Sequence, residues 1–159
     1  MDRIMQLQSA LLREIDRYAL LVQDRDQPLD WERVHMASSA RLAWILAEER
    51  GLDPELCACA CSVHDYGRIL TGRQEGHAEA GYEPVKLFLR RLHLFAPGEI
   101  EQIAVAVKNH SRKSYVDAPM DEVIKDADVL DCTWYGIPFS REEHRMRYEA
   151  YVSSRSHGR

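Results

Sequence analysis

Histidine and aspartate are the residue types in this chain that are best suited to chemistry. Histidine occurs seven times, and His35, in "WERVHMASSARLA", falls on the apolar side of a predicted helix. Asp128 lies within "VIKDADVLDCTW", where apolar neighbours make an unpaired carboxylate costly to bury. A metal ion would offset that cost, because imidazole and carboxylate together suit Mn, Fe, Co, Ni or Zn. The pattern therefore predicts a metal site.

Further candidate ligands lie at the ends of predicted helices. His64 and Asp65, in "CSVHDYGR", are adjacent, and consecutive residues of a helix point about 100° apart. Both can therefore reach one ion that lies over the helix end. His77 opens the next helix and His110 closes the one after it. The remaining histidines fit no such pattern, and we expect surface or packing roles for them: His93, His144 and His157.

Three cysteines in "CACACS" offer a competing interpretation. Cys57 and Cys61 lie one helical turn apart, a spacing that zinc sites use, but a structural zinc site needs a second pair downstream. Only Cys132 follows. Free cysteine is among the most buried residue types, so we expect small buried apolar side chains at these positions.

Hydrophobic periodicity predicts helices throughout the chain, and strand signals are scarce. The fold class is therefore predicted to be all-α. The helices are expected at about residues 1–22, 31–50, 53–65, 77–94, 96–109, 119–133 and 140–152, with loops at 66–76 and 111–118. Pro84 is expected to kink or restart the fourth of them.

Chain length, net charge and the distribution of apolar residues limit the class of protein. A chain of 159 residues suffices for one domain, expected at 1–152 with a core at 28–135 and a flexible tail at 153–159. A net charge of −5 argues against a duplex nucleic-acid binder. No apolar run is long enough to cross a membrane, and the charged start is no signal peptide, so we expect a cytoplasmic protein with reduced thiols.

The ordered set H…HD…H…H…D resembles the HD-domain superfamily of metal-dependent phosphohydrolases. The matching residues are His35, the pair His64 and Asp65, and Asp128 in "KDADVLD", which resembles the Ala-Asp-x-Leu that closes the family pattern. "EGHAEAG" and "VKNHS" supply the further histidines of the subset with two metals. The resemblance covers about residues 28–135 and implies a compact bundle of about six to seven helices.

The resemblance also implies a ligand set. His35, His64, Asp65 and Asp128 would hold one divalent transition metal. Asp65 would bridge to a second ion held by His77 and His110, and this second ion could also be Mg. Alternatively, His77 and His110 could contact substrate phosphate or water. Asp126 and Asp131 are expected on other helical faces, as solvated groups or partners of basic side chains.

The activity implied by the resemblance is hydrolysis of a nucleotide or another small phosphate ester. Asp65 would orient the water nucleophile or take its proton. Arg68 and Lys125 are the candidates to balance phosphate charge, Lys125 because it lies three residues before Asp128. Other basic residues are expected to be solvated: Lys108, Arg112 and Lys113.

Two alternatives to hydrolysis stay open. Some relatives with the fuller histidine set are di-iron oxygenases, and iron content with oxygen-dependent turnover would separate that chemistry from phosphate release. The other alternative is a non-catalytic helical module that binds metal or nucleotide. A homodimer built on the first helix and the tail is a further alternative to a monomer.

Overall fold

The structure is a computed structural model that describes residues 2–156, and His157 with the two residues after it lies outside them. Eight helices and no strand occur in that range, which confirms the all-α prediction. They are α1 (Arg3–Leu21), α2 (Leu29–Glu49), α3 (Pro54–Ser62), α4 (Tyr66–Thr71), α5 (His77–Leu92), α6 (Pro97–Asn109), α7 (Pro119–Trp134) and α8 (Glu142–Ser156). None of these helices is both long enough and apolar enough to cross a membrane.

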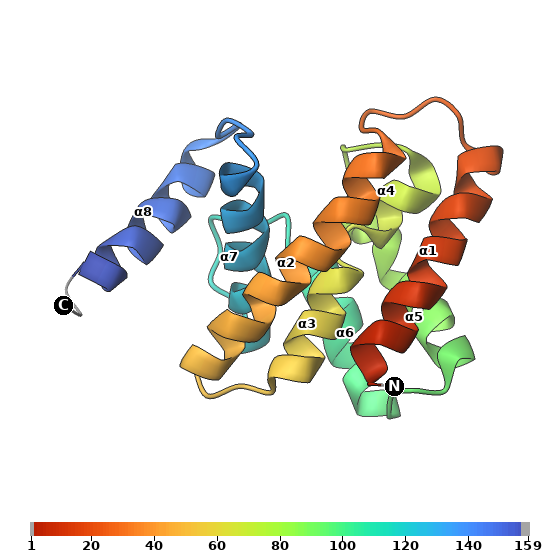
Figure 1. The fold of residues 1–159 in the computed structure, drawn as a ribbon, viewed down its shortest axis with the longest axis horizontal. Coiled ribbons are helices and arrows are strands. Elements are labelled where there is room, and N and C mark those ends of the chain that lie inside the picture. Colours follow the sequence, from red (N-terminus) through yellow and green to blue (C-terminus); the bar gives the residue numbers. More distant parts are fainter. Residues whose placement is uncertain (1, 157–159) are drawn as a thin grey trace.

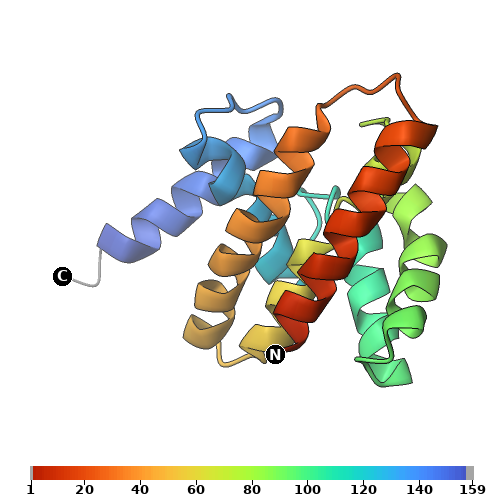
Figure 2. The same ribbon diagram turned by 45° about the vertical axis from the view of Figure 1, so that its right-hand side comes forward.

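The helices pack around α3, which lies inside the bundle. Helix α2 lies along α3 and is flanked by α1 and α7, while α5 and α6 pack together behind them (Figure 1). The turned view shows the same arrangement, with the C-terminal end of α8 extending away from the other helices (Figure 2). Among the element contacts of residues 2–156, the substantial ones of α8 are with α7.

Local sequence signals fix where α3 begins and why it is buried. The side chain of Asp53 accepts a hydrogen bond from the backbone N–H of Leu56, and Pro54 occupies the first helical turn. Cys57, Cys59 and Cys61 are all free thiols and all buried in the core. Burial raises the pKa of both Cys57 and Cys59 to about 12. The prediction of small apolar packing residues is therefore confirmed.

The structure departs from the predicted elements at residues 66–71 and at the C-terminal end, and at Pro84 it excludes a restart of the helix. Residues 66–71, expected in a loop, form the short helix α4, which ends at Gly72 with φ of 72°, the left-handed conformation that suits glycine. Helix α5 runs through Pro84 as one element. Helix α8 continues to Ser156, so residues 153–156 are helical where a flexible tail was expected.

Candidate metal centre

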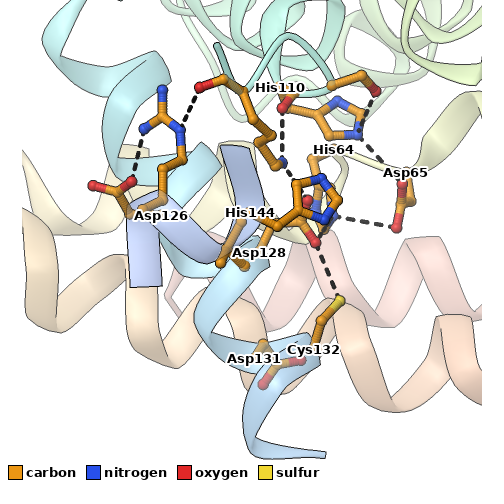
Figure 3. A network of polar contacts seen from close by, with 12 residues as sticks. His64, Asp65, His110, Asp126, Asp128, Asp131, Cys132 and His144 are labelled. Carbon is orange, nitrogen blue, oxygen red and sulfur yellow. Dashed lines mark hydrogen bonds and ion pairs between the residues drawn. The ribbon is translucent and has the colours of Figure 1, made fainter. Parts of the chain in front are cut away.

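Six side chains from five segments converge in the interior of the bundle. They are His35 of α2, His64 and Asp65 of the turn between α3 and α4, His77 at the start of α5, His110 at the end of α6, and Asp128 of α7. Figure 3 shows the central part of this network, with His64, Asp65, His110 and Asp128 turned toward one another. The structure therefore brings together all six residues that were predicted as metal ligands.

The carboxylate of Asp65 divides the cluster into two halves. Its Oδ2 lies 3.2 Å from Nε2 of His64 and 3.7 Å from Nε2 of His35. Its Oδ1 lies 3.0 Å from Nε2 of His77 and 3.5 Å from Nε2 of His110. Asp128 joins the first group, with Oδ1 at 3.2 Å from Nε2 of His35.

We call the first group, which consists of His35, His64, Asp128 and Asp65 Oδ2, the carboxylate half. The second group, which consists of His77, His110 and Asp65 Oδ1, is the imidazole half. Each half contains three donors close enough together to bind one ion, either His35, His64 and Asp65 or Asp65, His77 and His110. One bridging carboxylate with imidazoles on both sides suits a pair of divalent transition metals.

The outer nitrogen of every histidine ligand is held by an acceptor. Nδ1–H of His64, His77 and His110 each donates to a backbone carbonyl three residues earlier, at 2.6 Å. This contact leaves the Nε2 lone pair pointing into the cluster. Paired Nε2 atoms then face each other, at 3.1 Å between His35 and His64 and at 2.9 Å between His77 and His110. Two facing lone pairs repel unless a proton or a metal ion lies between them, and a metal ion can bind both nitrogens at once, so this donor set fits bound metal.

A close approach between helices places His77 next to Asp65. A Cβ atom added at Gly67 of α4 would lie 1.9 Å from the backbone oxygen of His77. Only glycine therefore lets α4 pack so tightly against the start of α5. Because Asp65 directly precedes α4, this packing holds the bridging carboxylate and the imidazole half together.

Charged neighbours keep the carboxylates ionised. Burial favours a higher pKa for Asp65, but the charges of Arg68 and His64 outweigh it and hold that pKa well below its usual range. The same opposition holds for Asp128, where burial favours a higher pKa but Lys113, His35 and His64 together hold the pKa well below its usual range. For His110 burial prevails and lowers the pKa to about 3, so this imidazole is neutral. Ionised carboxylate and neutral imidazole are the protonation states that bind metal.

Asp131, expected to be solvated or paired with a basic side chain, is instead a buried partner of a ligand. Its Oδ2 accepts a hydrogen bond from Nδ1–H of His35 at 2.6 Å and another from the hydroxyl of Ser38 at 2.8 Å. A carboxylate behind a metal-binding histidine fixes the orientation of the ring and raises its basicity. Asp126 behaves as expected, since it pairs with Arg50 and Arg147.

Arg68 reaches the cluster as predicted, but it is held on several sides. Its guanidinium contacts the carboxylate of Asp65, and its Nε donates to Glu32 at 2.6 Å. Nη1 donates to the side-chain oxygen of Gln74 at 2.6 Å. Arg68 is therefore placed to fix the orientation of Asp65.

Lys125 does not reach the cluster. Its fully buried Nζ donates to Tyr115 O at 2.9 Å, to Asp117 at 2.6 Å and to Glu122 at 2.8 Å. Side chains of an α-helix lean toward its N-terminus, so Lys125 reaches Glu122 of the preceding turn and lies away from Asp128. The contacts with Tyr115 and Asp117 tie the loop 111–118 to α7, and the predicted placement of Lys125 beside Asp128 is wrong.

Lys113, expected to be solvated, lies in the site instead. It is 4% exposed, and its Nζ contacts Oδ2 of Asp128 and donates to the backbone oxygen of His110 at 2.7 Å. An ammonium group has three donors, and these two are the contacts that Nζ makes among residues 2–156. The sequence offered one signal, which is that this lysine follows His110 by a single turn.

A pocket of about 270 Å³ opens onto the cluster. Its lining includes most of the predicted ligands and Lys113, and it also includes Trp31, whose ring stacks on His35 at 4.7 Å. Cys132 lies in the wall, with Sγ 3.5 Å from Oδ1 of Asp128, and burial raises the pKa of this thiol. Another part of the lining comes from the segment after α7 and the start of α8, and it includes His144, which was not predicted as a site residue.

Part of this chain is similar in sequence to known proteins. Ribonuclease Y of Cutibacterium acnes is 34% identical over 98 residues, which are 60% of this chain and 16% of that protein. Ribonuclease Y of Thermobifida fusca is 31% identical over 119 residues, which are 74% of this chain and 21% of that protein. The chain therefore spans about a fifth of the length of these relatives or less.

A solved structure shares the fold. The crystal structure of a predicted HD superfamily hydrolase from an uncultured Thermotogales bacterium has a TM-score of 0.59 and 21% identity, over 92% of this chain and 90% of that one. The family model for the HD domain matches residues 34–133, the span from α2 to α7 that carries every ligand of the cluster. The chain belongs to the HD-domain family.

Proposed function

We propose that this protein is a metal-dependent phosphohydrolase that acts on a nucleotide or another small phosphate ester. The observation that carries the proposal is the placement of Asp65, whose two carboxylate oxygens each face a separate group of imidazole nitrogens. Such a bridged site suits two ions. Bound divalent metal would lower the pKa of a coordinated water and polarise a phosphoryl oxygen.

The side chains around the cluster have separate roles in this proposal. Asp65 orients the water nucleophile and is itself held by Arg68. Lys113 binds a phosphate oxygen with the Nζ donor that Asp128 and the His110 carbonyl leave free. Because burial strengthens charge-assisted hydrogen bonds, this one contact also discriminates in favour of an anionic substrate.

The relatives support hydrolysis of a phosphate ester without specifying its size. The two curated relatives above are named as ribonucleases, and the structural neighbour is named as a predicted hydrolase. A phosphodiester is therefore as reasonable a substrate as a phosphomonoester. A pocket of about 270 Å³ favours a small substrate over a long strand.

The test compares wild type with Asp65→Asn, and Asp30→Asn is the matched control because Asp30 is an exposed partner of Arg33. Metal content is measured first. Phosphate release is then measured on p-nitrophenyl phosphate, bis(p-nitrophenyl) phosphate, a panel of mononucleotides and a short RNA. We expect metal-dependent turnover in wild type and the control, with loss of metal and turnover in Asp65→Asn.

The same measurements separate the alternatives. Iron as the native metal, together with turnover that requires oxygen and releases no phosphate, would favour an oxygenase. Tightly bound metal with no exchangeable water and no turnover on any substrate would favour a non-catalytic module. Unchanged metal content and activity in Asp65→Asn would remove the basis of the proposal.

A further inference from the structure

One wall of the pocket comes from a part of the chain that the family model does not cover. The match ends at residue 133. Pocket-lining residues continue beyond it, through the connection that follows α7 and into the first turn of α8: Ile137, Pro138, Phe139, Ser140, Arg141 and His144. This segment, residues 137–144, is called the C-terminal wall below.

Helix α8 is fastened to the loop that carries Lys113. Arg147 of α8 is largely buried, and its Nε donates to the backbone oxygen of Lys113 at 2.8 Å. Its other nitrogens contact Asp126 at 2.7 Å and Glu122 at 2.9 Å, both on α7. By contrast Arg145, two residues earlier, makes its ion pairs with Glu142 and Glu149 of the same helix. The C-terminal wall is thus a fixed part of the site.

Arg141 is held at the pocket by neutral acceptors. Its Nη2 donates to the backbone oxygen of Ser111 and to Nε2 of His144, each at 3.1 Å. Burial and the nearby charges of Lys113 and Arg141 lower the pKa of His144, which favours the neutral imidazole that can accept this hydrogen bond. The ion pair of Arg141 with Glu143 is long, at 3.4 Å. The guanidinium therefore keeps much of its capacity for an anion.

Ser111 shows how near Arg141 lies to the metal ligands. The hydroxyl of Ser111 is 3.4 Å from Nε2 of His110, while its carbonyl accepts from Arg141. A single residue thus separates a metal-binding nitrogen from the guanidinium. An anionic group that reaches Arg141 would therefore lie in the same pocket as a phosphate at the cluster.

We propose that the C-terminal wall selects phosphate esters that carry a second anionic group, with Arg141 as the specificity-determining residue. The inference rests on the proposed function, because the phosphate is taken to lie at the metal cluster. Arg141 binds the second anion, a carboxylate or a further phosphate, in place of its long contact with Glu143. His144 is a positioning residue that accepts from Nη2 and keeps the guanidinium turned toward the pocket.

The experiment measures binding, so its outcome does not depend on turnover. Titration calorimetry on the metal-loaded full chain compares 3-phosphoglycerate with glycerol 3-phosphate, two probes of similar size that differ in a carboxylate. A charge-assisted pair with arginine predicts that wild type binds the first about tenfold more tightly. Arg141→Gln should bring the ratio of the two dissociation constants to about one.

Two further variants control for structure and charge. Arg145→Gln removes a positive charge from the adjoining helix α8, and the tenfold ratio should persist. Arg141→Lys keeps the charge without the planar fork, and the ratio should stay above one. A ratio near one in wild type, or no binding of either probe, would overturn the proposal, as would a tenfold ratio in Arg141→Gln. If the ratio behaves as expected but no phosphate is released from any substrate, the proposed hydrolase function fails and the anion site stands.

Discussion

The two halves of the cluster share Asp65 but differ in what lies behind their ligands. In the carboxylate half, His35 is backed by the buried carboxylate of Asp131, and Asp128 adds a further negative charge. In the imidazole half, His77 and His110 are backed by backbone carbonyls alone. More negative charge around one ion gives stronger attraction for it in a low-dielectric interior. The comparison predicts that the carboxylate half fills first and the imidazole half second.

The largest effect should come from removing one imidazole from each half. Without His64 the carboxylate half loses a direct ligand, and His64→Ala should bind no metal tightly and lose activity by on the order of 1,000-fold. His110→Ala should keep one ion per chain. Elemental analysis after dialysis measures the stoichiometry. Equal loss of metal in both variants would show that the halves bind as one unit.

The two buried lysines provide the next test, because only one of them touches both halves. Lys113→Met should lower kcat by about 100-fold, since it removes a charge-assisted contact to phosphate, with a small change in stability. Lys125→Met should instead destabilise the fold by about 3 kcal/mol, because Asp117 and Glu122 lose a buried partner. Steady-state kinetics and urea unfolding separate the two effects. A reversed pattern would return the catalytic role to Lys125.

Asp131 tests the backing of the carboxylate half alone. Asp131→Asn keeps the shape but removes the charge behind His35, so metal affinity of that half should fall by about 10- to 100-fold. The imidazole half has no such partner and should be unaffected. Competition with a chromophoric chelator measures both constants. The matched control is Asp126→Asn, which alters ion pairs with Arg50 and Arg147 outside the cluster.

The smallest expected effect is a difference in proton release. Burial lowers the pKa of His35 and His64, but the neighbouring carboxylates outweigh it. Hydrogen bonds to Asp128 and Asp131 raise the pKa of His35, and the charge of Asp65 helps to raise the pKa of His64. The metal-free carboxylate half therefore carries protons near neutral pH that an ion must displace, whereas His110 is already neutral. Affinity of the carboxylate half should fall more steeply between about pH 8 and about pH 6. Calorimetry in buffers of different ionisation enthalpy counts the protons; equal release from both halves would contradict the comparison.

The convergence of the six candidate ligands could be predicted because each of them lies at a recognisable place in a helical pattern. His35 and Asp128 are polar residues on otherwise apolar helical stretches, and His77 and His110 mark helix ends. Their order in the chain resembles the family pattern, which placed Asp65 between the two groups. Helix periodicity and this order are enough to identify the six candidates, because all of them lie on helices or at helix ends.

The supporting residues could not be predicted in the same way. Lys113 lies in the loop 111–118, and hydrophobic periodicity does not predict the path of a loop. The contact between Lys113 and Asp128 could therefore not be predicted from the sequence. Lys125 was placed by its three-residue spacing from Asp128, but side-chain tilt carries it toward Glu122. Asp131 was assigned to another helical face, yet α2 packs against that face and buries it beside His35.

The sequence by itself determined the all-helical class and the buried cysteines of α3, because hydrophobic period is a local property, and the six candidate ligands followed from the resemblance of their order in the chain to the family pattern. Tertiary structure alone decided the division of the cluster at Asp65, the exchange of roles between Lys113 and Lys125, and the C-terminal wall with Arg141. Those features depend on which helix faces meet and where loops return. Such contacts join residues far apart in the chain, and no local pattern encodes their geometry.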